Sequence, residues 1–236
     1  MPSLNATKCK AGDLILFYGV NAVAVGQGAA KGLKVLTGLP ALISGAQGGA
    51  AAFQGLASAN HAAIITQVEG RRVFNMAHAT SAGVQLADVD NYLLGLDGRC
   101  QVFRMRGQFE FPAEAGAVGA TWASATTNGA AGIVYSTGKG FLSAFQSSSF
   151  GSGAKQRAAF YRANRGRAGG PADIGNMLEG RAKAMFCSMF AIACYQAVMS
   201  DMYLGQMLAL DAKHTSPMYL DGYLKGSQHW EQINAQ

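Results

Sequence analysis

Residues 60–68 read NHAAIITQV, and this stretch decides the fold class. A polar dipeptide leads into an apolar, partly β-branched run, which is typical of a buried strand that begins at His61. Residues 69–72 (EGRR) form a predicted hairpin turn, and residues 73–79 (VFNMAHA) return as the next strand. The sequence therefore predicts an antiparallel hairpin with a histidine on each of its two strands.

The rest of the chain supplies short strands and helices around this hairpin. Further strands are predicted over residues 14–18, 84–86 and 100–105. Helices are predicted over residues 113–126, 155–162, 178–199 and 219–224, with shorter ones at 89–94 and 141–145. The helix over 178–199 has the strongest helical pattern and contains Cys187. Together these elements predict an α+β fold, in which a small, mostly antiparallel sheet packs on the Cys187 helix.

Residues 19–59 interrupt this pattern with a long Gly- and Ala-rich segment that has few charges. We interpret the segment as an insertion into a single domain that spans residues 1–236. It would serve either as a lid or docking surface, or as a spacer. Its apolar part, residues 33–59, is broken by Pro40 and several glycines, so a membrane-spanning helix is not expected there. Contact of residues 33–59 with a membrane surface stays open.

The composition describes a basic globular protein. The 19 Lys and Arg residues outnumber the 13 Asp and Glu residues, which gives a formal net charge of +6 and a pI of about 9.2. A basic balance favours anionic partners such as a cell-wall polymer or a lipid headgroup surface. The basic residues are scattered, and no zinc-finger, RNA-binding or basic-helix pattern occurs, so no nucleic-acid partner is expected.

The four cysteines form no C-x-x-C pair and no metal-ligand spacing; they are Cys9, Cys100, Cys187 and Cys194. We expect reduced thiols, with up to two disulfides as the alternative, and neither a metal nor a cofactor. The N-terminus (MPSLN) has no basic segment followed by an apolar one, so no signal peptide is predicted. The sequence thus favours synthesis in the cytoplasm, and any role outside it would need a dedicated export machine.

A cysteine nucleophile needs a base, a group that orients the base, and backbone N–H groups for the developing oxyanion. The N-terminus of a helix lowers a thiol pKa and offers free N–H groups. Cys187 early in a helix and His61 on a strand supply the nucleophile and the base. His78 or Asn75 would orient His61, but alternation places these two residues on opposite faces, so only one can serve. The alternative is that Cys187 is a small buried apolar residue.

Five segments, taken in order, resemble the circularly permuted branch of the NlpC-type, papain-like cysteine hydrolase superfamily, in which the His strand precedes the Cys helix. They read AGDLIL at residues 11–16, NHAAII at 60–65, MAHATSAGV at 76–84, FCSMF at 186–190 and TSP at 215–217. Members often have Gly two residues after the His and an acidic residue two after the Cys, where this chain has Ala63 and Met189. The resemblance implies a permuted papain-like fold.

The resemblance also implies roles for residues. Cys187 would be the nucleophile, His61 the general base and His78 the orienting residue, with Asn75 as the alternative for the third role. The implied reaction is attack of the thiolate on an amide or ester carbonyl, followed by release of the acyl group to water or to another acceptor.

Three functions are compatible with this resemblance. The first is an amidase or endopeptidase that cleaves bacterial cell-wall peptides. Without a signal peptide, such an enzyme would resemble an antibacterial toxin exported into a rival cell, with an immunity protein and a secretion-machine carrier as partners. The second is a lipid-directed acyltransferase or thioesterase, because the same branch includes relatives similar to lecithin:retinol acyltransferase; residues 33–59 would then contact the bilayer. The third is an inactive binding module that has kept the fold.

Overall fold

The computed structural model describes residues 4, 8–18, 59–69, 73–80, 82–89, 99–127, 133–135, 149–168, 170 and 184–234 of the chain. The predicted insertion lies outside these residues, apart from Ala59. The helix expected at 141–145 and nearly all of the helix expected at 89–94 also lie outside them. In the described ranges, no helix is long and apolar enough to cross a membrane.

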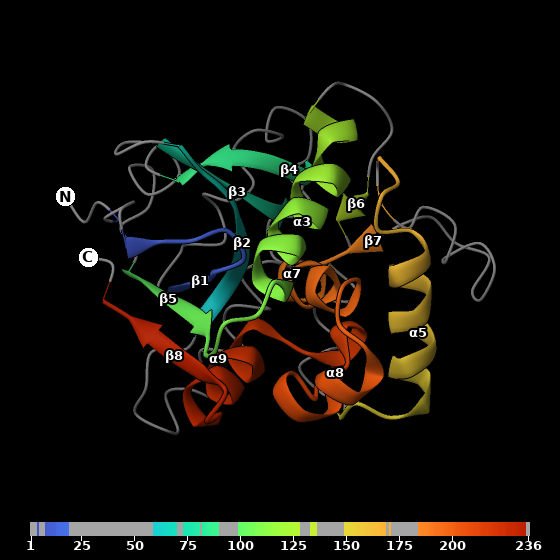
Figure 1. Cartoon of the computed structure of the whole chain (residues 1–236). Helices are drawn as coiled ribbons and strands as arrows, with labels where there is room; N and C mark the ends of the chain where they lie inside the picture. The colour runs from blue at the N-terminus through green and yellow to red at the C-terminus, as the bar shows by residue number, and fades with distance from the viewer. Residues whose placement is uncertain are drawn as a thin grey trace, which may run out of the picture.

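A six-stranded antiparallel sheet forms the centre of the fold (Figure 1). In spatial order, its strands are β4 (Gly83–Asp88), β3 (Val73–Thr80), β2 (Ala59–Glu69), β1 (Leu14–Tyr18), β5 (Arg99–Met105) and β8 (Trp230–Ile233). The predicted hairpin is confirmed as β2 and β3, and β1 pairs with the other edge of β2. The sequence pattern does not predict β8, which joins the sheet by pairing with β5.

Helices and a second, two-stranded sheet complete the part of the chain that the structure describes. They are α3 (Phe111–Thr127), β6 (Val134–Tyr135), α5 (Ser152–Ala163), β7 (Ala184–Met185), α7 (Cys187–Gln196), α8 (Asp201–Met207), the 3₁₀ helix η3 (Ala212–His214) and α9 (Pro217–Gly226). α3, α7 and α9 contact β2, and α5 contacts α7 (Figure 1). The predicted α+β class with an antiparallel sheet is therefore confirmed.

The helix that carries Cys187 is shorter than the predicted range 178–199. It begins at Cys187, because Phe186 is extended and the two residues before it form β7, which pairs in parallel with β6. It ends at Gln196, and Ser200, which is also extended, precedes α8. The prediction of one continuous helix was wrong at both ends. The apolar pattern continues through β7 and through the turn after Gln196, so it does not mark where the helix begins and ends.

Apolar side chains cover both faces of the sheet and form two clusters. Leu14 and Leu16 of β1 pack with the helices on one face, which we call the helix face. Ile15 and Phe17 point to the opposite face, where Cys9 also lies; we call it the far face. Because β1 is buried on both faces, its sequence is a continuous apolar run rather than an alternation.

The turn before β1 fits only glycine at position 12. Gly12 has φ +89°, and a Cβ there would lie 1.9 Å from the backbone oxygen of Pro112, at the start of α3. The Gly12 N–H donates to Ile65 O at 2.7 Å, and the Gly12 carbonyl accepts the Tyr195 hydroxyl at 2.6 Å. This turn therefore joins β2, α3 and the last turn of α7 at one point.

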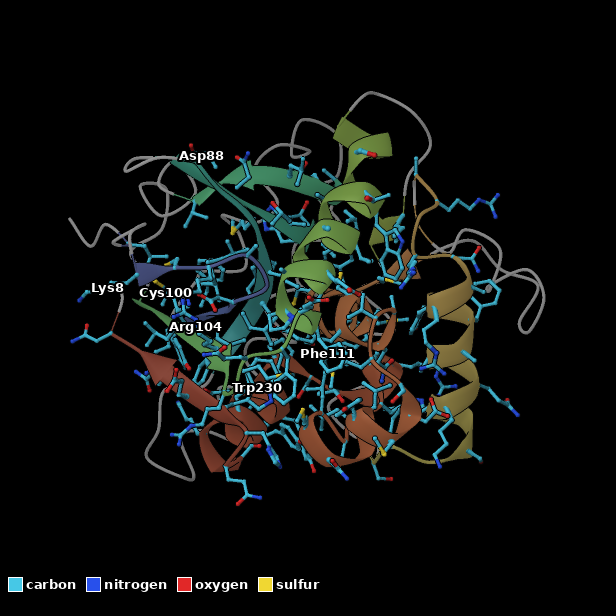
Figure 2. The ribbon with its side chains drawn as sticks, in the orientation of Figure 1. Lys8, Asp88, Cys100, Arg104, Phe111 and Trp230 are labelled. Carbon is cyan, nitrogen blue, oxygen red and sulfur yellow. The ribbon has the colours of Figure 1, made fainter. Side chains whose placement is uncertain are left out.

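A buried ion pair fixes the residue that follows this turn. The Asp13 carboxylate is 1% exposed and accepts Arg104 Nε at 2.9 Å, Arg104 Nη2 at 2.6 Å and the Lys10 N–H at 2.7 Å. Arg104 also donates to the Lys8 carbonyl at 2.7 Å, so it joins β5 to the segment before β1 (Figure 2). A buried carboxylate needs such pairing to offset its loss of hydration.

We expect Gly12→Ala to lower the free energy of unfolding by more than about 2 kcal/mol, because it adds a clash to an unfavourable φ. The matched control is Gly205→Ala in α8, where nothing lies within 4 Å of the added Cβ. That change should be neutral or slightly stabilising, since Ala favours a helix over Gly. Urea unfolding of both variants measures the difference, and equal stabilities would contradict the assigned turn.

Candidate functional site

Cys187 is the first residue of α7, and its side chain is buried, with 3% exposed. Three backbone N–H groups favour the thiolate form of its sulfur: those of Ala62 in β2, of Ser188 and of Cys187 itself. Burial outweighs these donors and raises the pKa of the Cys187 thiol to about 11. The thiol is therefore neutral at pH 7 while the site is closed.

His61 and His78 form a buried pair on neighbouring strands. His78 lies directly opposite Ala63, and His61 is two residues before Ala63, so both histidines project from the same face of the hairpin. His61 Nε2 and His78 Nδ1 are 3.0 Å apart, and the two rings meet edge to face at 5.2 Å. The structure thus brings together the predicted base and its predicted orienting residue.

Asn75, the alternative orienting residue, lies elsewhere on β3. It pairs with Gln67, beyond a register shift between Ile65 and Gln67, and its side chain is half-buried. Its backbone carbonyl accepts the Thr66 hydroxyl at 3.0 Å. Between the two candidates for the third role, the geometry favours His78.

The Cys187 thiol and the His61 ring approach β2 from different sides. The side chain of Ala62 packs with α7 on the helix face, whereas the neighbouring His61 ring lies 5.6 Å from the Phe17 ring on the far face. The thiol interacts with these backbone N–H groups, whereas His61 Nε2 is directed at His78. The structure places Cys187 beside the backbone of the His61 strand but does not join the two side chains.

Burial also sets the charge of the two histidines. Desolvation lowers the pKa of His78 to about 4. It lowers the pKa of His61 well below its ordinary value, and the neighbouring His78 lowers it further. Both imidazoles are therefore neutral at pH 7, and one ring can donate to the other only when their tautomers are complementary.

The other three cysteines lie apart from the Cys187 thiol in the core of the protein. Cys194 is fully buried in α7, and Cys9 and Cys100 are also buried. The two disulfides left open by the sequence are not formed among these cysteines. In the ranges that the structure covers, no group of three His, Cys, Asp or Glu side chains could hold a metal ion.

Ser188 and Thr215 support the start of α7, and the sequence pattern indicated no such role for either residue. The Ser188 hydroxyl donates to the Thr215 carbonyl at 2.7 Å, and both residues are fully buried. Residues 215–217 belong to the segments that resemble the papain-like superfamily, and this resemblance was the sequence signal for the region around Thr215. Nearby, the Nδ1 of His214 lies 3.1 Å from a carboxylate oxygen of the buried Asp211.

Comparisons with protein-family models, with curated proteins and with solved structures found no match to this chain. The site is therefore interpreted from its own geometry.

We expect the protein to lose stability as the pH falls from 6.5 towards 4. In this range His78 binds a proton in the unfolded chain but stays neutral in the folded protein. A pKa lowered from 6.5 to about 4 corresponds to about 3 kcal/mol of unfolding free energy, which is present above pH 6.5. His78→Gln should therefore lose less stability than the wild type between pH 7.5 and pH 4.5. Urea unfolding at both pH values measures this, and equal losses would contradict a buried neutral His78.

Proposed function

We propose that the protein is a cysteine-nucleophile hydrolase with a permuted papain-like arrangement, acting on amide bonds. Cys187 is the proposed nucleophile, His61 the general base and His78 the residue that orients His61. One observation carries the proposal: the thiol at the first residue of α7 contacts the Ala62 N–H, next in sequence to His61, whose Nε2 is 3.0 Å from His78. All three side chains thus lie near residues 61–63 of β2, with the thiol on the helix face and the two imidazoles on the far face.

The neutral resting charges favour general-base catalysis over a preformed thiolate–imidazolium pair. In the proposed reaction, the Cys187 sulfur attacks the amide carbonyl while His61 accepts the thiol proton. The imidazolium then donates this proton to the leaving amine, and an acyl group stays on the sulfur. Water attacks the thioester, giving its proton to His61, and the carboxylic acid leaves as the thiol is restored. The N–H groups of Ala62 and Ser188 are the proposed oxyanion donors.

The thiol and the imidazole must approach each other for this proton transfer. Catalytic hydrogen bonds are often long or absent before substrate binds. We propose that substrate binding shifts this end of β2, so that the His61 ring, which rests on the far face, reaches the Cys187 thiol. Its Nδ1 would then face the thiol, because Nε2 is the atom directed at His78. This movement would also hydrate Cys187 and bring its pKa down from the value set by burial.

Bacterial cell-wall peptides are the substrate class that we propose. The net charge of +6 suits an anionic polymer, and exposed Arg165 and Arg167 follow α5 on the surface. The lipid-directed alternative depends on residues 33–59, which lie outside the described residues. We therefore propose the amidase, because no observation in the described residues supports the acyltransferase.

An activated ester tests the nucleophile without knowledge of the natural substrate. We expect p-nitrophenyl acetate to acetylate Cys187, with turnover that falls by about 10²-fold or more in Cys187→Ala and in His61→Ala, as expected when nucleophile or base is lost. The rate should decrease at low pH, as His61 becomes protonated. Peptide mass spectrometry locates the acetyl group, and p-nitrophenol absorbance gives the rate.

Cys194→Ala is the matched control, because Cys194 is a second buried thiol on the same helix. It should retain wild-type turnover, although the small cavity costs some stability. Wild-type turnover in Cys187→Ala would overturn the proposed nucleophile.

The substrate class has its own test. Purified peptidoglycan should release new amino groups with wild-type protein and not with Cys187→Ala. If the natural role is that of a toxin, the protein sent to the periplasm of a test bacterium should lyse the cells, and cytoplasmic expression should not. Turnover of the ester without cleavage of peptidoglycan and without toxicity would keep the cysteine hydrolase and reject the cell-wall substrate.

A further inference from the structure

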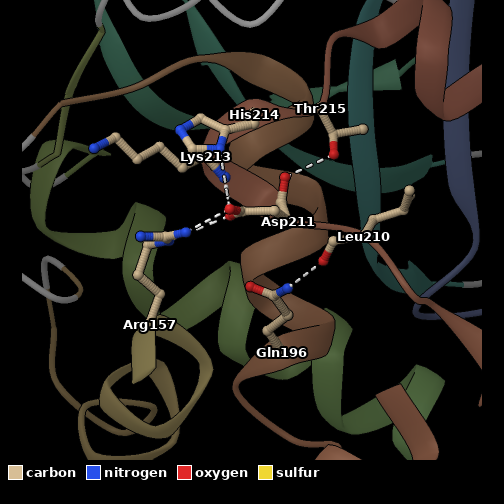
Figure 3. A network of polar contacts seen from close by, with 7 residues as sticks. All are labelled: Arg157, Gln196, Leu210, Asp211, Lys213, His214 and Thr215. Atoms are coloured by element: carbon tan, nitrogen blue, oxygen red, sulfur yellow. Dashed lines mark hydrogen bonds and ion pairs between the residues drawn. The ribbon is translucent and has the colours of Figure 1, made fainter. Parts of the chain in front are cut away.

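Segment 210–215 is held against both ends of α7. At the N-terminal end, the Ser188 hydroxyl donates to the Thr215 carbonyl at 2.7 Å. At the C-terminal end, Gln196 Nε2 donates to the Leu210 carbonyl at 2.7 Å (Figure 3). The four residues that form these two hydrogen bonds are all buried. The segment therefore spans the length of the helix that begins with Cys187.

Asp211 is the centre of this segment. Its carboxylate accepts Arg157 of α5 through Nε at 3.2 Å and through Nη2, and the His214 ring lies on another side at 3.1 Å (Figure 3). It also accepts the Lys213 N–H at 3.0 Å, which caps η3. Its backbone carbonyl accepts the Thr215 hydroxyl at 2.6 Å. One buried residue thus fixes the conformation of the whole segment.

A continuous chain of contacts connects this ion pair to the proposed nucleophile. Arg157 donates to the Asp211 carboxylate, and the backbone carbonyl of Asp211 accepts the Thr215 hydroxyl. The Thr215 carbonyl in turn accepts the hydroxyl of Ser188, which is next to Cys187. The Ser188 N–H is one of the groups that stabilise the Cys187 thiolate. A buried charge that is fully paired keeps its partners in one geometry, because leaving it unpaired costs several hydrogen bonds.

We propose that Asp211 is a positioning residue, which holds the first turn of α7 so that the Cys187 thiol stays against the Ala62 N–H. The inference rests on the proposed function in taking Cys187 as the nucleophile. Asp211 does not touch the thiol; it acts through Thr215 and Ser188. Loss of this support frees the first turn of α7 while the rest of the helix stays packed against α3 and β2.

Two cysteines on one helix make the test selective. Cys187 lies in the first turn and Cys194 in the third, and both are buried in the folded protein. Local release exposes Cys187 alone, whereas global unfolding exposes both thiols. Iodoacetamide labelling of the full-length protein, read at each cysteine by peptide mass spectrometry, separates these cases and does not require any hydrolase activity.

The central variant is Thr215→Val, which keeps the side-chain shape and removes the hydroxyl. We expect Cys187 to be alkylated about five- to tenfold faster, the size of effect expected from one lost buried hydrogen bond, with Cys194 unchanged. Burial is the main cause of the raised pKa of Cys187, so the alkylation profile should also shift to lower pH. Thr215→Ser should restore wild-type behaviour.

Ion-pair variants test Asp211 itself. Arg157→Ala should reproduce the Thr215→Val result, and Asp211→Asn, which keeps the side-chain shape, should do the same. The control is Arg162→Ala on the same helix, which removes the 2.8 Å contact with Asp201 of α8 and leaves segment 210–215 intact. It should alkylate like the wild type.

The outcomes are distinct. Unchanged Cys187 alkylation in Thr215→Val and Asp211→Asn would overturn the positioning role, and so would a parallel rise at Cys187 and Cys194. Absence of ester turnover in the wild type, together with selective release of Cys187 in the variants, would keep the positioning role and reject the proposed hydrolase.

Discussion

The packing of α7 against β2 is the constraint on which the rest of the structure depends. All ten residues of α7, from Cys187 to Gln196, are buried, so other elements must cover the helix on every side. β2 and β3 lie along one side, while α3, α5 and η3 cover others. The same packing brings the first turn of α7 to the Ala62 N–H, where the structure has its clearest candidate for chemistry.

Two buried carboxylates hold this helix from opposite directions. Asp13 pairs with Arg104 and stabilises the turn whose Gly12 carbonyl accepts the Tyr195 hydroxyl near the end of α7. Asp211 pairs with Arg157 and stabilises the segment that accepts the Ser188 hydroxyl at its start. Since an unpaired buried carboxylate is costly, each pair restricts its turn to one geometry. The start of α7 is therefore held by segment 210–215, and its last turn by both this segment and the Gly12 turn.

A closed site of this kind has a chemical consequence. Burial keeps Cys187, His61 and His78 neutral, so the resting protein stores no thiolate that an oxidant or alkylating agent could attack at neutral pH. In the proposed hydrolase, reactivity would then depend on a movement of β2 relative to α7, with the energy supplied by substrate binding. Burial of Cys187 thus protects the thiol from reagents, and it also means that the proposed reaction requires a movement of the protein.

The sequence by itself determined the central hairpin, β1 and the α+β class, because continuous apolar runs, glycine turns and the helical period are local signals. It also pointed to His61, His78 and Cys187; the fold pairs the two histidines on the far face and leaves Cys187 on the helix face. The tertiary structure alone decided where α7 begins, since β7 needs a partner from a distant segment, and it alone recruited β8 to the sheet. The choice of His78 over Asn75 depended on strand register, and the Asp211 network depended on loops that meet only after folding, because neither leaves a periodic trace in the sequence.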